Sequence, residues 1–113
     1  MASIHYMNLN NDPFQLIKNQ TKTIEMRLYD EKRRMIAIGD RIIFKNNKTE
    51  EIISVKVVNL FIYKDFFALY QEHDKVSIGY DANDIANPED MYQYYSEEKI
   101  LKYGVVGIAI ALE

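Results

Sequence analysis

The chain has 113 residues, of which 48% are hydrophobic and 27% charged, and these values predict one globular domain over residues 1–113 with a core of its own. It contains no cysteine, which excludes disulfides, zinc sites built on thiolates and cysteine nucleophiles. The formal net charge of −3 argues against a protein that coats nucleic acid by bulk electrostatics.

The first element predicted along the chain is a helix that begins within Asn11–Gln15. Asp12 is expected as its N-cap and Pro13 as its first helical residue, and Gln15 is placed to close a capping box. The helix is expected to end near Asn19 and Gln20, before the chain turns into a strand.

Residues 23–29 are predicted to form that strand, because apolar and polar side chains alternate there. One face is apolar, and the other carries Thr23, Glu25 and Arg27. Lys22 precedes the strand directly. Since Lys22 and Glu25 have opposite parity on an ideal strand, their side chains converge only if the chain bends near Thr23.

The middle of the chain is predicted to hold a short helical turn and two strands. The turn covers residues 30–34, and Gly39-Asp40 precedes a strand over residues 41–45. The longest strand is expected over residues 52–63, where an alternating half is followed by an almost wholly apolar one. We expect that second half to be buried on both faces.

The last third of the chain is predicted to be helical until a final strand. Asp65 is placed to cap one helix, Asn87–Asp90 to begin a second, and Ser96 to begin a third that ends at Gly104. Residues 105–112 are apolar on both faces, which predicts a central strand. This order of elements is mixed α+β, and the sharp alternation favours a barrel.

Charge is distributed unevenly along the chain. Residues 18–48 carry nine Lys or Arg against four Asp or Glu, whereas residues 49–113 carry five against twelve. These balances predict a two-sided molecule, unless the fold intermingles the charges. No run approaches the ~18 consecutive apolar residues of a membrane span, and the start of the chain lacks the pattern of a secretory signal. We therefore expect a cytoplasmic location and no membrane partner.

A short motif around Lys22 resembles a known signature. The run Lys22-Thr23-Ile24-Glu25-Met26-Arg27 is similar to G-x-K-x-x-E-x-R, the signature of the ASCH (activating-signal-cointegrator homology) family. Gly39-Asp40, Tyr94-Tyr95-Ser96 and the ending Tyr103–Ile108 also resemble that family. Gln20 stands where the signature has glycine, and Asn19 is expected to supply a left-handed residue one position earlier.

The resemblance implies a PUA-like β-barrel with flanking short helices and a charged cleft built on this strand. In the family such a cleft is proposed to hold RNA or a modified nucleoside. A bacterial branch hydrolyses the acetyl amide of N4-acetylcytidine, and its essential lysine matches Lys22. That branch has a threonine where Glu25 stands, and its late-helix glutamate corresponds approximately to Glu89. Some other members are linked to RNA cleavage.

The first hypothesis is a binding domain for RNA or a modified nucleoside, with Lys22, Glu25, Arg27 and Glu89 in one cleft. A carboxylate beside Lys22 keeps its ammonium charged, which favours holding a phosphate or carbonyl over nucleophilic attack. Arg27 offers a planar fork that can stack on a base or grip a phosphate in two places. The alternative for the same residues is a solvated ion-pair face on an edge strand.

Further ligand-binding candidates lie outside the motif. Arg33 and Arg34 are predicted to contact RNA phosphates beside the cleft, or else to form a solvated surface. Tyr29 is predicted as an exposed aromatic side chain next to this basic run. The late tyrosines are expected either to stack on bases or, for two of the three, to be core residues; they are Tyr92, Tyr94 and Tyr95.

Two other classes of function stay open. In the enzyme hypothesis, Lys22 attacks or activates attack on an acylated nucleoside while Glu25 or Glu89 moves the proton, giving an amidohydrolase, or else a ribonuclease. The third is a protein-interaction module that uses the tyrosine-rich, acidic half. His5 and His73 lie far apart, no glycine-rich phosphate loop is present, and no motif is specific for DNA. We therefore expect neither a metal nor a cofactor.

Overall fold

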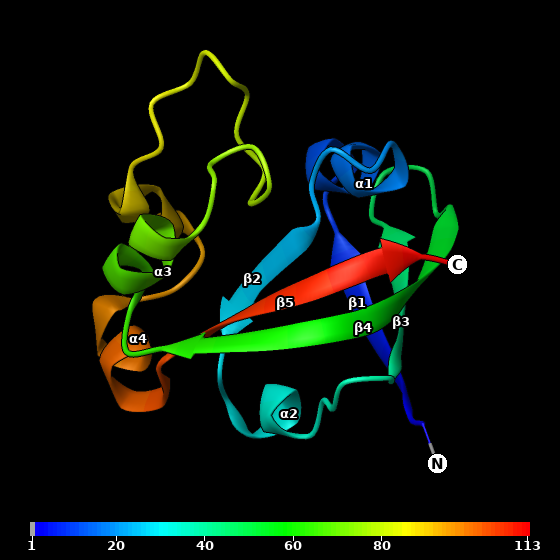
Figure 1. Cartoon of the computed structure of the whole chain (residues 1–113), viewed down its shortest axis with the longest axis horizontal. Coiled ribbons are helices and arrows are strands. Elements are labelled where there is room, and N and C mark those ends of the chain that lie inside the picture. Colours follow the sequence, from blue (N-terminus) through cyan, green and yellow to red (C-terminus); the bar gives the residue numbers. More distant parts are fainter. Residues whose placement is uncertain (1) are drawn as a thin grey trace.

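The structure is a computed structural model that describes residues 2–113 (Figure 1). Its elements form a five-stranded sheet with short helices around it. In chain order they are β1 (Ile4–Leu9), α1 (Asn11–Lys18), β2 (Ile24–Leu28), α2 (Glu31–Arg34), β3 (Arg41–Asn46), β4 (Ile52–Tyr63), α3 (Phe66–Glu72), the 3₁₀ helix η1 (Pro88–Gln93), α4 (Glu97–Tyr103) and β5 (Val105–Leu112).

The strands lie in the order β1-β3-β4-β5-β2. β1 pairs with β3 in parallel, and every other neighbouring pair is antiparallel. The sheet curls into a half-barrel, so this is the mixed α+β, PUA-like architecture that the sequence predicted. β1 and β2 are its two edges. As Figure 1 shows, α3 and α4 lie together at one end of the sheet, and α1 lies near the other.

Two hydrophobic clusters hold the fold together. Phe14 and Ile17 of α1 fill the curled face of the sheet together with Phe44 of β3, and all three are almost fully buried. A second cluster joins β2 to the helical end, where Phe66 and Leu69 of α3 are equally buried. Burying side chains of this size is the main source of stability in a domain of this length.

The first helix and the first strand differ from prediction. The N-cap of α1 is Asn10, whose side chain makes no cap hydrogen bond, and Pro13 is the third helical residue. The predicted capping by Asp12 is wrong, because the Asn10 carbonyl already accepts the Phe14 N–H (3.1 Å) and so begins the helix earlier. β1 was not predicted. Its parallel pairing with β3 is a long-range contact that local pattern does not reveal.

The strand predicted over residues 52–63 is confirmed as β4, but the burial expected for its second half is wrong. Val58 and Ile62 are 47% and 53% exposed, and Val58 is left out of the pairing with β5 by the register shift between Val57 and Asn59. The central position of β5, between β4 and β2, is confirmed.

The predicted helix boundaries in the last third are confirmed at their caps. Asp65 accepts the Ala68 N–H, Ser96 accepts the Lys99 N–H, and Gly104 ends α4 at φ 72°. No helix within residues 2–113 combines the length and the apolarity that crossing a bilayer requires.

Candidate functional site

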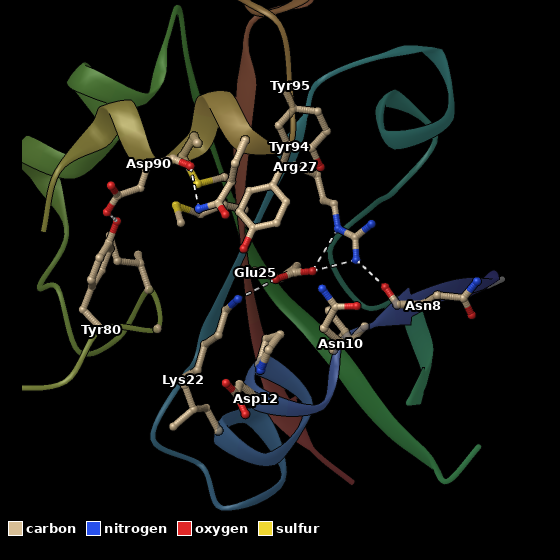
Figure 2. A pocket seen from close by; sticks show the side chains of 18 of the residues that line it. Asn8, Asn10, Asp12, Lys22, Glu25, Arg27, Tyr80, Asp90, Tyr94 and Tyr95 are labelled. Carbon is tan, nitrogen blue, oxygen red and sulfur yellow. Dashed lines mark hydrogen bonds and ion pairs between the residues drawn. The ribbon is translucent and has the colours of Figure 1, made fainter. Parts of the chain in front are cut away.

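A cleft of about 470 Å³ opens between α1 and the helical end of the molecule (Figure 2). This volume lies within the range typical of small-molecule sites. Its walls come from four parts of the chain: the β1–α1 junction with α1, the stretch from Lys22 into β2, the turn after β3, and the segment from α3 to the two residues after η1. The polar residues that line it are Asn8, Asn10, Asp12, Lys22, Glu25, Arg27, Asn47, Tyr70, Tyr80, Asp90, Gln93, Tyr94 and Tyr95.

Lys22, Glu25 and Arg27 form a continuous charged chain in this cleft. Lys22 Nζ donates to Glu25 Oε1 (2.8 Å), and Arg27 Nε donates to Glu25 Oε2 (2.9 Å). Glu25 is 3% exposed and Lys22 is 8% exposed. The three head groups therefore meet at one concavity, as the signature implied, and not on a solvated strand face. We call these residues the charged trio.

Glu25 is ionised within the trio. Burial raises the pKa of this carboxyl, but the charges and hydrogen bonds of Lys22 and Arg27 outweigh burial and leave the pKa below its ordinary value of 4.5. Within residues 2–113, Glu25 is the only side chain to which Lys22 donates. The other N–H groups of the ammonium are thus available to a ligand.

A bend in the chain brings Lys22 to Glu25, as parity required. The Lys22 N–H donates to the Leu16 carbonyl (3.0 Å), so Lys22 still belongs to the turn after α1. Thr23 and Ile24 both donate their N–H to the Ser77 carbonyl (3.0 Å each), and regular pairing of β2 starts only there. The predicted bend near Thr23 is confirmed.

Gln20 adopts the left-handed conformation that the signature glycine would provide. Its φ is 66°, whereas that of Asn19 is −87°, so the expectation placed on Asn19 is wrong. Asn19 serves the turn with its side chain, because its Oδ1 accepts the Thr21 N–H (3.0 Å). A positive φ at Gln20 explains why a glycine suits this position.

The loop after α3 packs against the lysine. Gly79 has φ 115°, and a Cβ at this position would lie 3.3 Å from Lys22 Cδ. The neighbouring Tyr80 hydroxyl donates to Asp90 (2.8 Å) and shares a hydrogen bond with Tyr70 (2.9 Å). Burial, followed by these two hydrogen bonds, raises the pKa of Tyr80 far above its ordinary value, so the phenol stays protonated.

Tyrosines form an aromatic wall beside the trio. Tyr94 lines the cleft and is 59% exposed, and Tyr95 lines it while stacking on Phe66 (centroids 6.1 Å apart, 14° between planes). Tyr92 is 42% exposed and lies outside the lining. The expectation that two of these three tyrosines are core residues is therefore wrong, because only Tyr95 packs against a core cluster.

Arg27 also closes the open seam of the half-barrel. Its Nη2 donates to the Asn8 carbonyl on β1 (3.0 Å), while Arg27 itself lies on β2, the opposite edge strand. One side chain thus connects two edges that share no backbone pairing within residues 2–113. The trio therefore lies where the two edge strands, β1 and β2, are connected by the Arg27 side chain.

The late carboxylate in the cleft is Asp90. Glu89, the residue predicted from the resemblance, is exposed and does not line the cleft. Both belong to η1, in which successive side chains point in different directions; Asp90 points into the cleft, and Glu89 points to solvent. The resemblance matched Glu89 only approximately, and the structure places the neighbouring Asp90 in the cleft.

Tyr29, Arg33 and Arg34 gather around α2 and do not line the cleft. The exposure predicted for Tyr29 is wrong, because its ring is half-buried against a core cluster. Arg33 pairs with Asp30 (3.0 Å), and the Arg34 guanidinium lies 4.2 Å from the centroid of the Tyr29 ring. Arg34 also donates to the Tyr103 carbonyl (3.1 Å). These local partners hold the Arg33 and Arg34 side chains near α2, outside the lining of the cleft, and their predicted contact with RNA phosphates stays a prediction.

The two histidines lie apart from the trio. His5 contacts Asp40 (2.8 Å), and His73 shares a hydrogen bond with the Tyr63 hydroxyl (2.8 Å). Within residues 2–113, no three His, Asp or Glu side chains are grouped in a way that would hold a metal ion.

Several lining residues carried no signal of their own in the sequence. Asn8 and Asn10 stand in an unpredicted strand and its exit, Tyr80 lies in an irregular segment, and Asp12 was interpreted only as a cap. A surplus of asparagine around residues 8–11 was the one available hint, since such side chains favour turns and ligand contacts over strand interiors.

Comparison with known proteins identifies relatives along almost the whole chain. The model of the ASCH domain matches residues 7–113. The crystal structure of the hypothetical protein PH0355 is 35% identical, with a TM-score of 0.82 over 97% of this chain and 99% of that one. Protein PF0455 from Pyrococcus furiosus is 34% identical, with a TM-score of 0.73 over 96% of both chains.

A more distant likeness concerns the fold alone. The structure of a serine-to-alanine mutant of ZmASCH from Zymomonas mobilis is 13% identical, with a TM-score of 0.62 over 96% of this chain and 67% of that one. A search of curated proteins found no significant match.

Proposed function

We propose that this chain, which belongs to the ASCH domain family, binds one nucleobase in the cleft above Lys22, Glu25 and Arg27. The base would belong to a free or modified nucleoside, or to an unpaired nucleotide of RNA. The observation that carries this proposal is the charged trio: a buried carboxylate bonded to two cations, at 2.8 Å and 2.9 Å, within a small-molecule-sized cleft.

The lining supplies the contacts that a base requires. The unused N–H groups of Lys22 can donate to a ring carbonyl, and carboxylate and amide oxygens can accept from ring or exocyclic N–H groups. The exposed ring of Tyr94 offers a stacking surface, as aromatic side chains do in recognition of unpaired bases.

The state of the lysine favours binding over nucleophilic attack. Lys22 Nζ forms an ion pair with an ionised carboxylate at 2.8 Å, in which an ammonium donates a charge-assisted hydrogen bond. An ammonium donates hydrogen bonds but has no lone pair with which to attack a carbonyl carbon. In its resting arrangement the trio is therefore suited to hold a polar ligand.

Calorimetric titration with nucleosides and with a short single-stranded RNA tests this proposal. We expect saturable binding by wild type, at least tenfold weaker binding by Lys22→Met, and unchanged binding by the matched control Lys48→Met, whose exposed side chain lies outside the cleft. Unchanged affinity in Lys22→Met would sink the proposal. For RNA, the salt dependence of the affinity counts the phosphates that the protein contacts.

Amide hydrolysis is the second candidate, and the Lys22–Glu25 contact is the observation that favours it. Proton transfer from the ammonium to the carboxylate would leave a neutral amine that takes a proton from water as the water oxygen attacks the acyl carbon of an acylated base such as N4-acetylcytidine. The acyl C–N bond then breaks, the protonated Glu25 gives its proton to the leaving amine, and acetic acid and cytidine are released. Following cytidine release from N4-acetylcytidine tests this candidate. Identical time courses for wild type and Lys22→Ala would eliminate it.

A further inference from the structure

We infer that the cleft takes an uncharged ligand, a free nucleoside or base, and discriminates against its phosphorylated forms. This inference rests on the proposed function and narrows it to one class of ligand. It is drawn from the charges that line the cleft and from the partners that those charges already have.

Negative groups outnumber positive ones in the lining. Lys22 and Arg27 are the two cationic residues there, against Asp12, Glu25 and Asp90, so the formal balance of two minus three is −1. A phosphate monoester adds about −1.5 to −2 at pH 7. A site of this sign repels such a group, whereas a neutral base has no net charge to oppose.

Both cations, Lys22 and Arg27, already form ion pairs with Glu25. Arg27 donates through Nε to Glu25 and through Nη2 to the Asn8 carbonyl, and its Nη2 also lies 2.8 Å from Glu25 Oε2 in an ion pair. Lys22 is paired with the same carboxylate and is 8% exposed. A phosphate that accepts from the spare N–H groups of Lys22 would therefore approach a cation whose charge the Glu25 carboxylate, 2.8 Å away, already offsets.

The remaining carboxylates lie on two sides of the cleft. Figure 2 shows Asp12 beside Lys22 on the α1 side, and Asp90 next to Tyr80 on the η1 side. Asp12 makes no side-chain hydrogen bond or ion pair with any residue that the structure describes, and it is exposed. A phosphate attached to a base in the cleft would thus approach one carboxylate or the other.

Among the described residues that line the cleft, no cation besides Lys22 and Arg27 offsets this charge. The run of positive residues that would serve as a phosphate contact surface, Lys32–Arg34, is absent from the lining, and Arg33 is paired with Asp30. The features of a neutral base fit better, because it can accept from Lys22 and donate to carboxylates while stacking on Tyr94.

Titration with matched ligands tests this inference. The probes are cytidine, uridine, adenosine and guanosine, each compared with its 5′-monophosphate at low ionic strength. We expect the best-bound nucleoside to bind at least tenfold more tightly than its monophosphate. Asp12→Asn should narrow that ratio by about threefold, because it removes one nearby charge without removing a core contact. Asp81→Asn, an identical change at a residue outside the lining, should leave the ratio unaltered.

Raising the salt concentration should also narrow the ratio, since screening weakens repulsion between exposed charges. Monophosphates that bind as tightly as nucleosides, or more tightly, would overturn the inference while leaving base binding intact. Binding of the short single-stranded RNA without binding of any nucleoside would also overturn the inference alone. Absence of binding by every nucleoside, every monophosphate and the short RNA would overturn the proposed function, and this inference with it. The two failures are therefore distinguishable in one set of titrations.

Discussion

Two carboxylates are buried in this molecule with similar exposure and different surroundings. Asp40 is 5% exposed and accepts hydrogen bonds from the backbone N–H of Ser3 (3.0 Å) and Ala37 (2.9 Å), as well as contacting His5 (2.8 Å). Glu25 is 3% exposed and receives its charged partners only from side chains. The first site joins the turn before β3 to the start of β1, and the second opens on the cleft.

The difference teaches how to tell a structural carboxylate from a functional one. Backbone donors are fixed by the fold, so the Asp40 site is complete and has little left to offer a ligand. The donors of Glu25 are an ammonium and a guanidinium with N–H groups to spare. Both carboxylates are buried, but only Glu25 has partners with unused N–H groups beside a cavity.

The largest effect on stability is expected when Lys22, one of the two cationic partners of Glu25, is removed. Lys22→Met should lower the free energy of unfolding by about 3 kcal/mol, because it leaves a buried carboxylate with Arg27 as its one remaining cation. Denaturant unfolding of wild type and variant measures this difference.

A double variant then separates stability from function. Lys22→Met with Glu25→Gln removes the uncompensated charge, so it should recover much of the lost stability and none of the ligand binding. If binding returned together with stability, the trio would have only a structural role.

A smaller effect on stability is expected at the Asp40 site. Asp40→Asn should cost about 1–3 kcal/mol, since the new amide N–H₂ would face backbone donors that need an acceptor. Thermal or denaturant unfolding gives this cost, and nucleoside titration of the same variant should match wild type. A loss of binding in Asp40→Asn would show that the two carboxylate sites are coupled.

Lowering the pH should remove the stability that ionised Asp40 contributes, within a defined pH interval. The hydrogen bond from His5, followed by those from Ser3 and Ala37, holds the pKa of Asp40 at about 2, against an ordinary value of 3.8. Because the folded pKa is the lower one, the stability due to ionised Asp40 is complete above pH 3.8 and is lost as the pH falls through about 2. The difference in unfolding free energy between wild type and Asp40→Asn should therefore shrink over this interval. A constant difference down to pH 2 would contradict this account.

The smallest effect concerns the turn that delivers Lys22 to the cleft. Gln20→Gly should stabilise the fold by about 0.5–1 kcal/mol, because glycine adopts φ 66° without steric cost and this gain exceeds its loss of chain entropy. Asn19→Gly, at a position with negative φ and a used side chain, should instead destabilise. Unfolding free energies with opposite signs at these neighbours would confirm the assignment of the left-handed residue.

Sequence reasoning succeeded where a few neighbouring residues decide the structure. The span of β4, the cap at Asp65 and the end of α4 at Gly104 follow from alternation, a side-chain acceptor and a left-handed glycine, all of which act within one or two turns. The trio was found in the same way, because its three members lie within six residues.

Sequence reasoning failed where the outcome depended on distant partners. β1 exists because β3, more than thirty residues later, provides its hydrogen bonds. Asp90 lines the cleft and Glu89 does not because of how η1 packs against α3, whereas both residues are acidic in the sequence. Arg33 pairs with Asp30, and Arg34 lies over the Tyr29 ring, so both guanidinium groups lie near α2.

The sequence by itself determined the charged trio, the mixed α+β class and the membership of its family, since these depend on residue identity and short-range order. Only the tertiary structure decided that the trio lines a cleft, that Arg27 spans the seam between β1 and β2, and that Asp12 and Asp90 share the same cavity. The physical reason is that burial and the sign of a local field are sums over neighbours in space, and most of those neighbours here are far away along the chain.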